Sequence, residues 1–208
     1  MLLATRRSVP RKRGLARRSR LEESARELLK DHELDTLSLG DVARHAGVPV
    51  SSAYHFYDDI RDLYAALLAK IQEEALELHR KPLPGVPRTW PEVVGKFARA
   101  GVRFFHADPA AARLMVGPKT PADLKLRDRA NDIALGRLME EQISRHFVLP
   151  PIPSRSRIFF RAVEIADLMF SLSMVEYGRI TREYTDEAIR AMVAYLGSYF
   201  PAELPRRK

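Results

Sequence analysis

The sequence contains no cysteine and no long apolar segment. Without cysteine there is no disulfide framework, no thiol nucleophile and no cysteine-built metal site. No run approaches the roughly 20 apolar residues that span a bilayer, and the first 20 residues lack the apolar core of a signal peptide. We therefore expect a soluble, cytoplasmic protein without a membrane partner.

The common enzyme motifs are missing as well. The 6 histidines are scattered without the spacing of a metal site, and no GxSxG, P-loop or GxGxxG motif occurs. The sequence therefore nominates no catalytic residue, cofactor or metal ligand. A remote alternative is an enzyme whose active site is a cavity in the C-terminal part of the chain.

Positive charge is concentrated at the N-terminus. Eight basic residues precede the first acid, Glu22, and without them 27 basic residues face 27 acidic ones, so this segment carries the whole net charge of +8. The eight are Arg6, Arg7, Arg11, Lys12, Arg13, Arg17, Arg18 and Arg20. We expect residues 1–18 to form a flexible basic arm, which beside a DNA-reading motif would contact the DNA backbone or minor groove. The alternative is a solubilising terminus without a defined site.

The rest of the chain has helical periodicity and no alternating strand pattern, which predicts an all-α fold. Ser19 and Glu22 form a capping-box pattern, so the first helix is expected from residue 19 to about 32. Further helices are expected at 58–80, 91–107, 109–115, 120–147, 156–180 and 185–200. The proline-rich segments 81–91 and 149–153 separate some of them.

Residues 36–63 have the pattern of a helix-turn-helix. Ser38 and Asp41 are spaced as a capping pair at the start of the first helix. Gly47 suits its left-handed end, and Pro49 suits the first turn of the second helix. The turn is therefore encoded locally.

This stretch and the helix before it resemble the N-terminal domain of the TetR family of transcriptional regulators. The resemblance rests on Leu21, Ala25, Leu28 and Leu29, on Ser38, Leu39, Asp41, Val42, Ala43, Ala46, Gly47 and Val48, and on Tyr54, His55, Tyr57 and Leu63. It implies that the helix near Pro49 enters the major groove and that the Tyr-His segment follows the phosphate backbone.

Three positions depart from the family pattern. Ile60 stands where a lysine is common, Glu33 where a glycine often ends the first helix, and Pro49 where a serine often opens the recognition helix. Arg61 is a candidate to replace the lysine contact. The full set of candidate DNA-binding residues is Arg17, Arg18, Ser38, Leu39, Pro49, Val50, Ser51, Ser52, Tyr54, His55, Tyr57 and Arg61.

We expect residues 19–64 to form the helix-turn-helix domain and residues 65–208 a helical effector-binding and dimerisation domain. Small residues alternate with large ones in the last two helices. Examples are Phe159, Ala162, Ala166, Phe170 and Ser173, then Ala188, Ala191, Ala194 and Gly197. Such a pattern suits either a two-fold helical interface or an intramolecular core, and the family resemblance favours a homodimer.

Methionine and phenylalanine adapt to apolar ligands, although they are more often plain core. The resemblance implies an effector cavity in the larger domain. The candidate lining residues are Phe97, Phe104, Phe105, Met115, Leu138, Met139, Phe160, Asp167, Met169 and Met174. Asp167 lies on an apolar stripe, where it either anchors a polar or cationic group of an effector or pairs with Arg161 or Arg103.

Together these features predict a ligand-responsive, dimeric DNA-binding regulator, a repressor that binds a palindromic operator and is released by a small, largely apolar effector. The alternative is an all-helical module that binds a small molecule or a protein, with a degenerate DNA-reading motif. Its support is Ile60 and a recognition helix without Lys or Arg.

Overall fold

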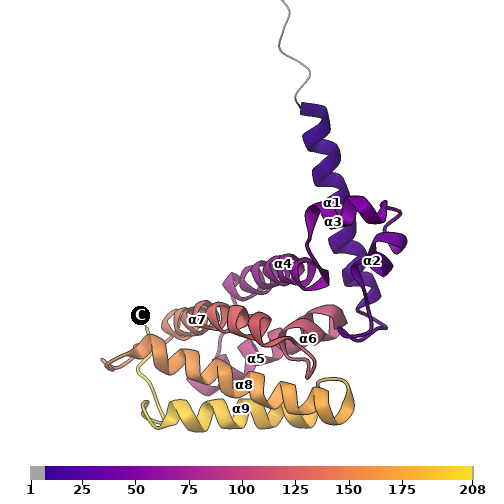
Figure 1. Cartoon of the computed structure of the whole chain (residues 1–208). Helices are drawn as coiled ribbons and strands as arrows, with labels where there is room; N and C mark the ends of the chain where they lie inside the picture. The colour runs from indigo at the N-terminus through magenta and orange to yellow at the C-terminus, as the bar shows by residue number, and fades with distance from the viewer. Residues whose placement is uncertain (1–7, 208) are drawn as a thin grey trace, which may run out of the picture. The chain divides into compact units, whose positions relative to one another are not determined.

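The computed structural model describes residues 8–207, and the side chains of residues 13–207. The described residues form nine α-helices and no β-strand, which confirms the all-α prediction (Figure 1). The helices are α1 (Ser8–Leu28), α2 (Leu39–His45), α3 (Val50–Phe56), α4 (Ile60–Arg80), α5 (Trp90–Ala107), α6 (Pro109–Met115), α7 (Ala122–Ser144), α8 (Arg155–Tyr177) and α9 (Arg182–Gly197). None of these helices is long and apolar enough to cross a membrane.

The chain divides into two compact units, Met1–Lys70 and Ile71–Lys208. The division falls inside α4 rather than after residue 64, because the first half of α4 packs with the N-terminal helices. Leu63, Tyr64, Leu67 and Leu68 of α4 are all buried. The hydroxyl of Tyr64 donates a hydrogen bond to the carbonyl of Leu34 at 3.1 Å. One helix therefore contributes residues to both units.

Helix α1 begins at Ser8, well before the expected cap at Ser19. The capping-box prediction is wrong, because the hydroxyl of Ser19 lies within the helix and donates to Glu23 at 2.9 Å. Five of residues 11–20 are Arg, which favours helix, and Arg18 pairs with Glu22 one turn later at 3.3 Å. Residues 8–18 of the expected flexible arm are therefore helical, and residues 1–7 lie outside the described part.

The helix-turn-helix forms as the local pattern predicts. The Ser38 side chain accepts a hydrogen bond from the Asp41 N–H while the Asp41 carboxylate accepts one from the Ser38 N–H, which confirms the capping box. Gly47 has a φ of +60°, a conformation that glycine adopts without a Cβ penalty. Both helices pack on the core of this unit through buried side chains, which include Val42, Val48 and Ala53.

The C-terminal unit is a bundle in which α7 packs on α8 and α8 packs on α9, and α5 contacts α7 and α9. Figure 1 shows α7, α8 and α9 side by side in successive layers. The backbones of α7 and α8 approach closely at Gly136, where an added Cβ would lie 2.7 Å from the backbone nitrogen of Phe160. Only glycine fits this crossing without a shift of one helix.

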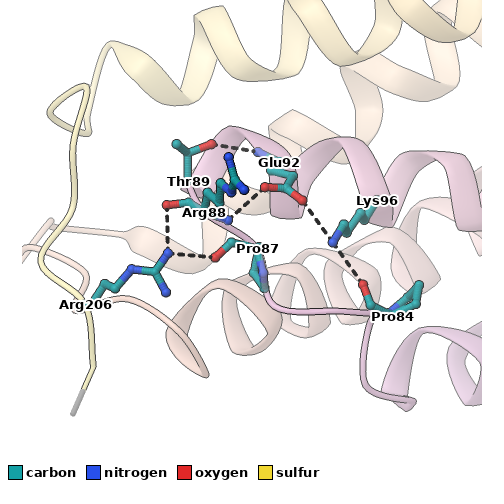
Figure 2. A network of polar contacts seen from close by, with 7 residues as sticks. All are labelled: Pro84, Pro87, Arg88, Thr89, Glu92, Lys96 and Arg206. Carbon is teal, nitrogen blue, oxygen red and sulfur yellow. Dashed lines mark hydrogen bonds and ion pairs between the residues drawn. The ribbon is translucent and has the colours of Figure 1, made fainter.

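A polar network holds the proline-rich segment before α5 (Figure 2). Lys96 pairs with Glu92 at 3.0 Å and donates to the carbonyl of Pro84 at 2.9 Å. The Glu92 carboxylate also accepts the N–H of Arg88 at 2.8 Å. Arg206 donates to the carbonyls of Pro87 and Arg88 at 3.2 Å each. The C-terminal segment thereby fixes the entry into α5.

Candidate nucleic-acid interface and ligand cavity

Helix α3 presents an exposed polar and aromatic surface. Ala53 faces the core, so the side chains on the opposite side of the helix point outward. Pro49, Val50, Ser51 and His55 are exposed, Ser52 is half-buried, and Tyr54 keeps 54% of its surface exposed. Hydroxyl, imidazole and phenol groups on one surface can contact phosphates and base edges.

Two of the predicted DNA-binding side chains are buried instead. Leu39 packs in the core, and Tyr57 is 4% exposed. The Tyr57 hydroxyl donates to Glu22 at 2.8 Å and accepts from Arg18 Nε at 3.2 Å. Burial raises the pKa of Tyr57 to about 12. Tyr57 therefore joins the end of α3 to α1, and its side chain does not face outward.

Three other candidates keep exposed side chains in different settings. Arg17 and Arg61 are exposed at the surface of α1 and the start of α4. Ser38 is exposed, but its hydroxyl donates to Asp41 at 2.5 Å. That hydrogen bond is the main cause that lowers the pKa of Asp41 to about 2. Ser38 thus serves the helix cap, which leaves one hydroxyl lone pair for another donor.

Arg18, also a candidate, is exposed but engaged. Its guanidinium lies over the Tyr57 ring, 5.6 Å from the centroid, and pairs with Glu22 at 3.3 Å. The hydrogen bond to Tyr57 is the main cause that raises the pKa of Arg18. Arg6 and Arg7 lie outside the described residues.

The C-terminal unit encloses an apolar cavity of about 50 Å³ between α4, α5, α6, α7, α8 and α9. Six of the ten predicted ligand-binding residues line it. They are Phe97, Phe104, Phe105, Met115, Met139 and Asp167. The other four do not line it. Leu138 and Met174 are buried in other parts of the core, and Phe160 and Met169 are half-buried.

The sequence reasoning missed the contribution of α4 to this cavity. Ala75 and His79 line it, and so do Gly101, Phe170 and Met192. His79 lies near the end of α4, the helix expected at 58–80, where no lining residue was predicted. Ala75 and His79 are four residues apart, so they lie on the same face of α4. This spacing could have predicted that both residues line one cavity.

His79 is a polar group inside this apolar wall. Its ring is buried, and its centroid lies 4.2 Å from that of the Phe97 ring, with the two planes tilted by 45°. Nδ1 lies 2.8 Å from the carbonyl of Ala75, so this nitrogen carries the proton and donates. Burial lowers the pKa of His79, which keeps the ring neutral near pH 7. Nε2 lies at the wall beside Gly101, where an added Cβ would lie 3.7 Å from it.

Asp167 does not have the predicted environment. It lies beside two other carboxylates, Asp128 and Asp132 of α7, and oxygens of all three lie within 4.8 Å of one another. The expected ion pair with Arg161 or Arg103 is therefore wrong, because the charges that act on Asp167 come from Asp128, Glu164 and Lys125. Burial is the main cause that raises its pKa.

Of the two helices expected to dimerise, α8 buries the residues that suggested the interface, whereas α9 buries Ala188 but leaves Ala194 and Gly197 exposed. Phe159, Ala162, Ala166, Phe170 and Ser173 are all buried within one chain. They form the intramolecular core, the alternative that the pattern left open. The outward face of α8 carries a different apolar stripe, in which Leu168, Leu172 and Val175 are exposed beside half-buried Ile165.

Both units match models of one protein family. Residues 88–200 match the model described as "Tetracyclin repressor-like, C-terminal domain". Residues 22–67 match the model described as "Bacterial regulatory proteins, tetR family". The chain belongs to the TetR family of transcriptional regulators. TetR-family regulators are DNA-binding proteins rather than enzymes, and they are generally ligand-responsive repressors.

Solved structures of TetR regulators share this fold over nearly their whole length. A TetR-family transcriptional regulator from Streptomyces coelicolor is 23% identical with a TM-score of 0.67, over 88% of this chain and 99% of that one. A TetR transcriptional regulator from Rhodococcus sp. RHA1 is 17% identical with a TM-score of 0.62, over 89% and 97%. A TetR/AcrR-family regulator from Thermobifida fusca YX-ER1 is 19% identical with a TM-score of 0.53, over 89% and 99%. No curated protein matches the sequence.

Proposed function

We propose that this TetR-family protein is a homodimeric repressor that reads a palindromic operator with α3 and is released by a small, largely apolar effector. The observation that carries the DNA-reading part is the exposed side of α3. Val50, Ser51, Tyr54 and His55 project from a helix whose other side is anchored by Ala53. Arg17 and Arg61 supply exposed positive charge in the same unit.

Different residues of the N-terminal unit are proposed to provide DNA affinity and sequence readout. α3 carries no Lys or Arg, so hydroxyls and rings read the groove while arginines outside α3 bind phosphates. Such a reader depends on a second copy, because a recognition helix without Lys or Arg makes only weak contacts to a single half-site. Two copies on a two-fold axis meet half-sites roughly 34 Å apart.

The second copy docks on the outward face of α8 in this proposal. Leu168, Leu172 and Val175 recur at spacings of three and four residues, so they form one apolar stripe on the helix surface. Exposed Ala194 and Gly197 on α9, the neighbour of α8, leave room for a close helix approach. The last two helices thus supply the dimer face with their exposed residues.

The dimer face is tested by Leu172→Arg in the full chain, with light scattering after gel filtration as the measurement. We expect a monomer that binds operator at least about tenfold more weakly. Leu126→Arg changes an equally apolar side chain on α7, 66% exposed, and should stay dimeric. A dimer that survives Leu168→Arg and Leu172→Arg together contradicts this face.

The effector site is the aromatic cavity. Its volume of about 50 Å³ is well below the roughly 300 Å³ of the smaller ligand pockets. An effector must therefore displace side chains to enter. Ala75 and His79 of α4 form part of the wall, and α4 begins in the DNA-reading unit. An effector that favours one position of α4 shifts the DNA-binding equilibrium by its difference in affinity between the two conformers.

The cavity is tested with N-phenyl-1-naphthylamine, an uncharged aromatic probe whose fluorescence rises in apolar sites. Gly101→Ala places a methyl group 3.7 Å from His79 Nε2 without a clash. We expect about tenfold weaker probe binding with an unchanged fold. Gly197→Ala, where a Cβ meets nothing within 4 Å, is the control. Equal probe binding by both variants contradicts this site.

DNA reading is tested by fluorescence anisotropy with a duplex from upstream of the chain's own coding region. Tyr54→Ala should weaken binding by about 1–3 kcal/mol if the ring contacts the duplex. His32→Ala removes an exposed ring of the same unit outside α2 and α3 and should leave the affinity unchanged. If the chain binds neither this duplex nor any member of a random duplex library, it is instead a helical module with a degenerate reader.

A further inference from the structure

The acidic cluster Asp128, Asp132 and Asp167 has the arrangement of a cation site. Asp128 and Asp132 are one turn apart on α7, so both point from the same face of that helix. Asp167 reaches the same place from α8. One carboxylate oxygen of each residue lies within 4.8 Å of the other two. Asp128 is 3% exposed and Asp132 is 2% exposed.

One oxygen of this cluster is buried without any hydrogen-bond partner. Oδ1 of Asp132 receives no donor among the described residues, although almost none of the side chain reaches solvent. A buried carboxylate oxygen without a donor is unfavourable. Oε1 of Glu164, beside the cluster, is in the same situation. The carboxyl groups of Asp132 and Glu164 are close enough to share a proton, and no basic side chain donates to either of these two oxygens.

The charges around the cluster do not balance. A cavity of about 200 Å³ is lined by Lys125, Asp128, Arg129, Asp132, Glu164, Asp167, Leu168 and Ser171. Arg129 pairs with Glu164 at 3.3 Å, and Lys125 donates to the carbonyl of Met115 at 2.8 Å. Four carboxylates therefore face two basic side chains. Full ionisation leaves two excess negative charges beside this cavity.

We propose that Asp128, Asp132 and Asp167 bind one divalent cation of the class that prefers oxygen ligands, such as Mg²⁺, Mn²⁺ or Ca²⁺. The site offers only carboxylate oxygens, and such donors select hard cations. Ligand oxygens on opposite sides of such an ion lie roughly 4–5 Å apart, because each metal–oxygen distance is about 2.0–2.6 Å. The observed limit of 4.8 Å agrees with this span.

A neighbouring amide positions one ligand. Gln72 donates from Nε2 to Oδ1 of Asp128 at 3.0 Å, which leaves the other oxygen for the cation. Such a hydrogen bond orients a metal-binding carboxylate. A divalent ion also neutralises both excess charges, whereas an alkylammonium neutralises one. The site therefore suits a single metal ion better than an organic cation.

The test is titration calorimetry of Mn²⁺ into the full-length protein, without DNA or effector. We expect saturable binding of one Mn²⁺ per chain. Asp132→Asn should weaken binding at least about tenfold, since loss of a second-shell partner alone costs that much. Glu141→Gln, an exposed acid on the same helix, is the control and should bind like the parent chain.

Asp167→Asn is the second test variant and should also weaken Mn²⁺ binding. Because Asp167 is only partly buried, this substitution should not impair folding. Both variants should unfold at the same temperature as the cation-free parent or higher. Absence of saturable Mn²⁺ binding, or binding unchanged in both variants, overturns the proposal. Binding of tetramethylammonium that depends on Asp132, without Mn²⁺ binding, also overturns it. Because no DNA is present, none of these results bears on the repressor function.

Discussion

The two units treat their buried polar groups in opposite ways. In the N-terminal unit the buried Tyr57 hydroxyl is closed between Glu22 and Arg18, a carboxylate and a guanidinium that complete its hydrogen bonds. In the C-terminal unit buried Asp132 lies beside other acids, and one of its oxygens has no donor. The first network gives the buried hydroxyl both a donor and an acceptor, whereas in the second the side-chain hydrogen-bond partner of Asp132 is another acid, Glu164.

This difference matches the tasks of a ligand-responsive regulator. A DNA reader gains from rigidity, since the side chains of α3 must keep a fixed geometry. A sensing unit gains from groups whose partners come from outside, because a ligand shifts an equilibrium only through contacts that differ between states. The cavity beside His79 and the acidic cluster are two such places, and Asp167 borders both.

The largest expected effect comes from Gly136→Ala. This variant tests whether the close crossing of α7 and α8 stabilises the C-terminal unit. The added methyl group meets backbone atoms of Phe159 and Phe160 at 2.7–3.0 Å. We expect a loss of roughly 1–3 kcal/mol in the free energy of unfolding, measured with denaturant. Gly14→Ala in α1, where the nearest atom is 4.0 Å away, should not destabilise the chain. Equal stability of both variants contradicts a tight crossing.

The second largest effect is the pH dependence of the stability of the C-terminal unit. The folded pKa values of Asp128, Asp132 and Asp167 are raised above the ordinary value of 3.8, so the folded form binds protons more tightly than the unfolded chain. Their stabilising contribution is fully present below about pH 4 and is lost as the pH rises through the folded values, which begin at about 6 for Asp128. With a chelator present, the melting temperature should fall from about pH 5 to about pH 8.

Asp132→Asn together with Asp167→Asn should flatten this dependence and raise stability at about pH 8 by roughly 1–2 kcal/mol. Glu141→Gln should retain the full pH dependence. Saturating Mn²⁺ should reverse the loss in the parent chain alone. A pH profile that is the same in the double variant and the parent speaks against a strained acidic cluster.

A smaller effect is expected from Tyr57→Phe, which opens the closed network of the DNA-reading unit. Loss of the hydroxyl removes hydrogen bonds to Glu22 and Arg18, and we expect a loss of about 1 kcal/mol in chemical denaturation. The parent should also lose stability between pH 10 and 12, because burial raises the folded pKa of Tyr57 to about 12. Tyr54→Phe is the matched control, since Tyr54 is exposed. If both variants are equally stable, the network does not stabilise this unit.

The smallest effect is on the salt dependence of DNA binding. Arg17→Gln should reduce the slope of log affinity against log salt by about one, as one phosphate contact is lost. Arg190→Gln on α9, where the guanidinium pairs with Glu187, should leave the slope unchanged. An unaltered slope in Arg17→Gln shows that the exposed arginines of α1 do not bind phosphates.

The sequence predicted local features better than those that depend on distant residues. Ser38, Asp41 and Gly47 encode the helix-turn-helix through contacts within a few positions, and the structure has that turn. The start of α1 was wrong because Ser19 fits a cap pattern, while helix-favouring residues before it continue the helix. A cap pattern marks a helix start only where the preceding residues disfavour helix.

The cavity and the acidic cluster show more clearly that sequence patterns do not predict contacts between residues on different helices. Phe97 and Phe104 were predicted because phenylalanine adapts to apolar ligands and the family resemblance implies a cavity, but His79 lies on α4, where no lining residue was predicted. Asp132 and Asp167 lie on different helices, and no spacing rule joins them. Their juxtaposition follows from the close crossing at Gly136, which only the packed backbone reveals.

The most direct test is a hydroxyl-radical footprint of the full-length protein on the DNA upstream of its own coding region. The account predicts two protected half-sites about one helical turn apart, related by a palindrome, and loss of both in Tyr54→Ala but not in His32→Ala. Protection that Tyr54→Ala leaves intact, or a single unpaired site, would contradict a dimer that reads DNA with α3.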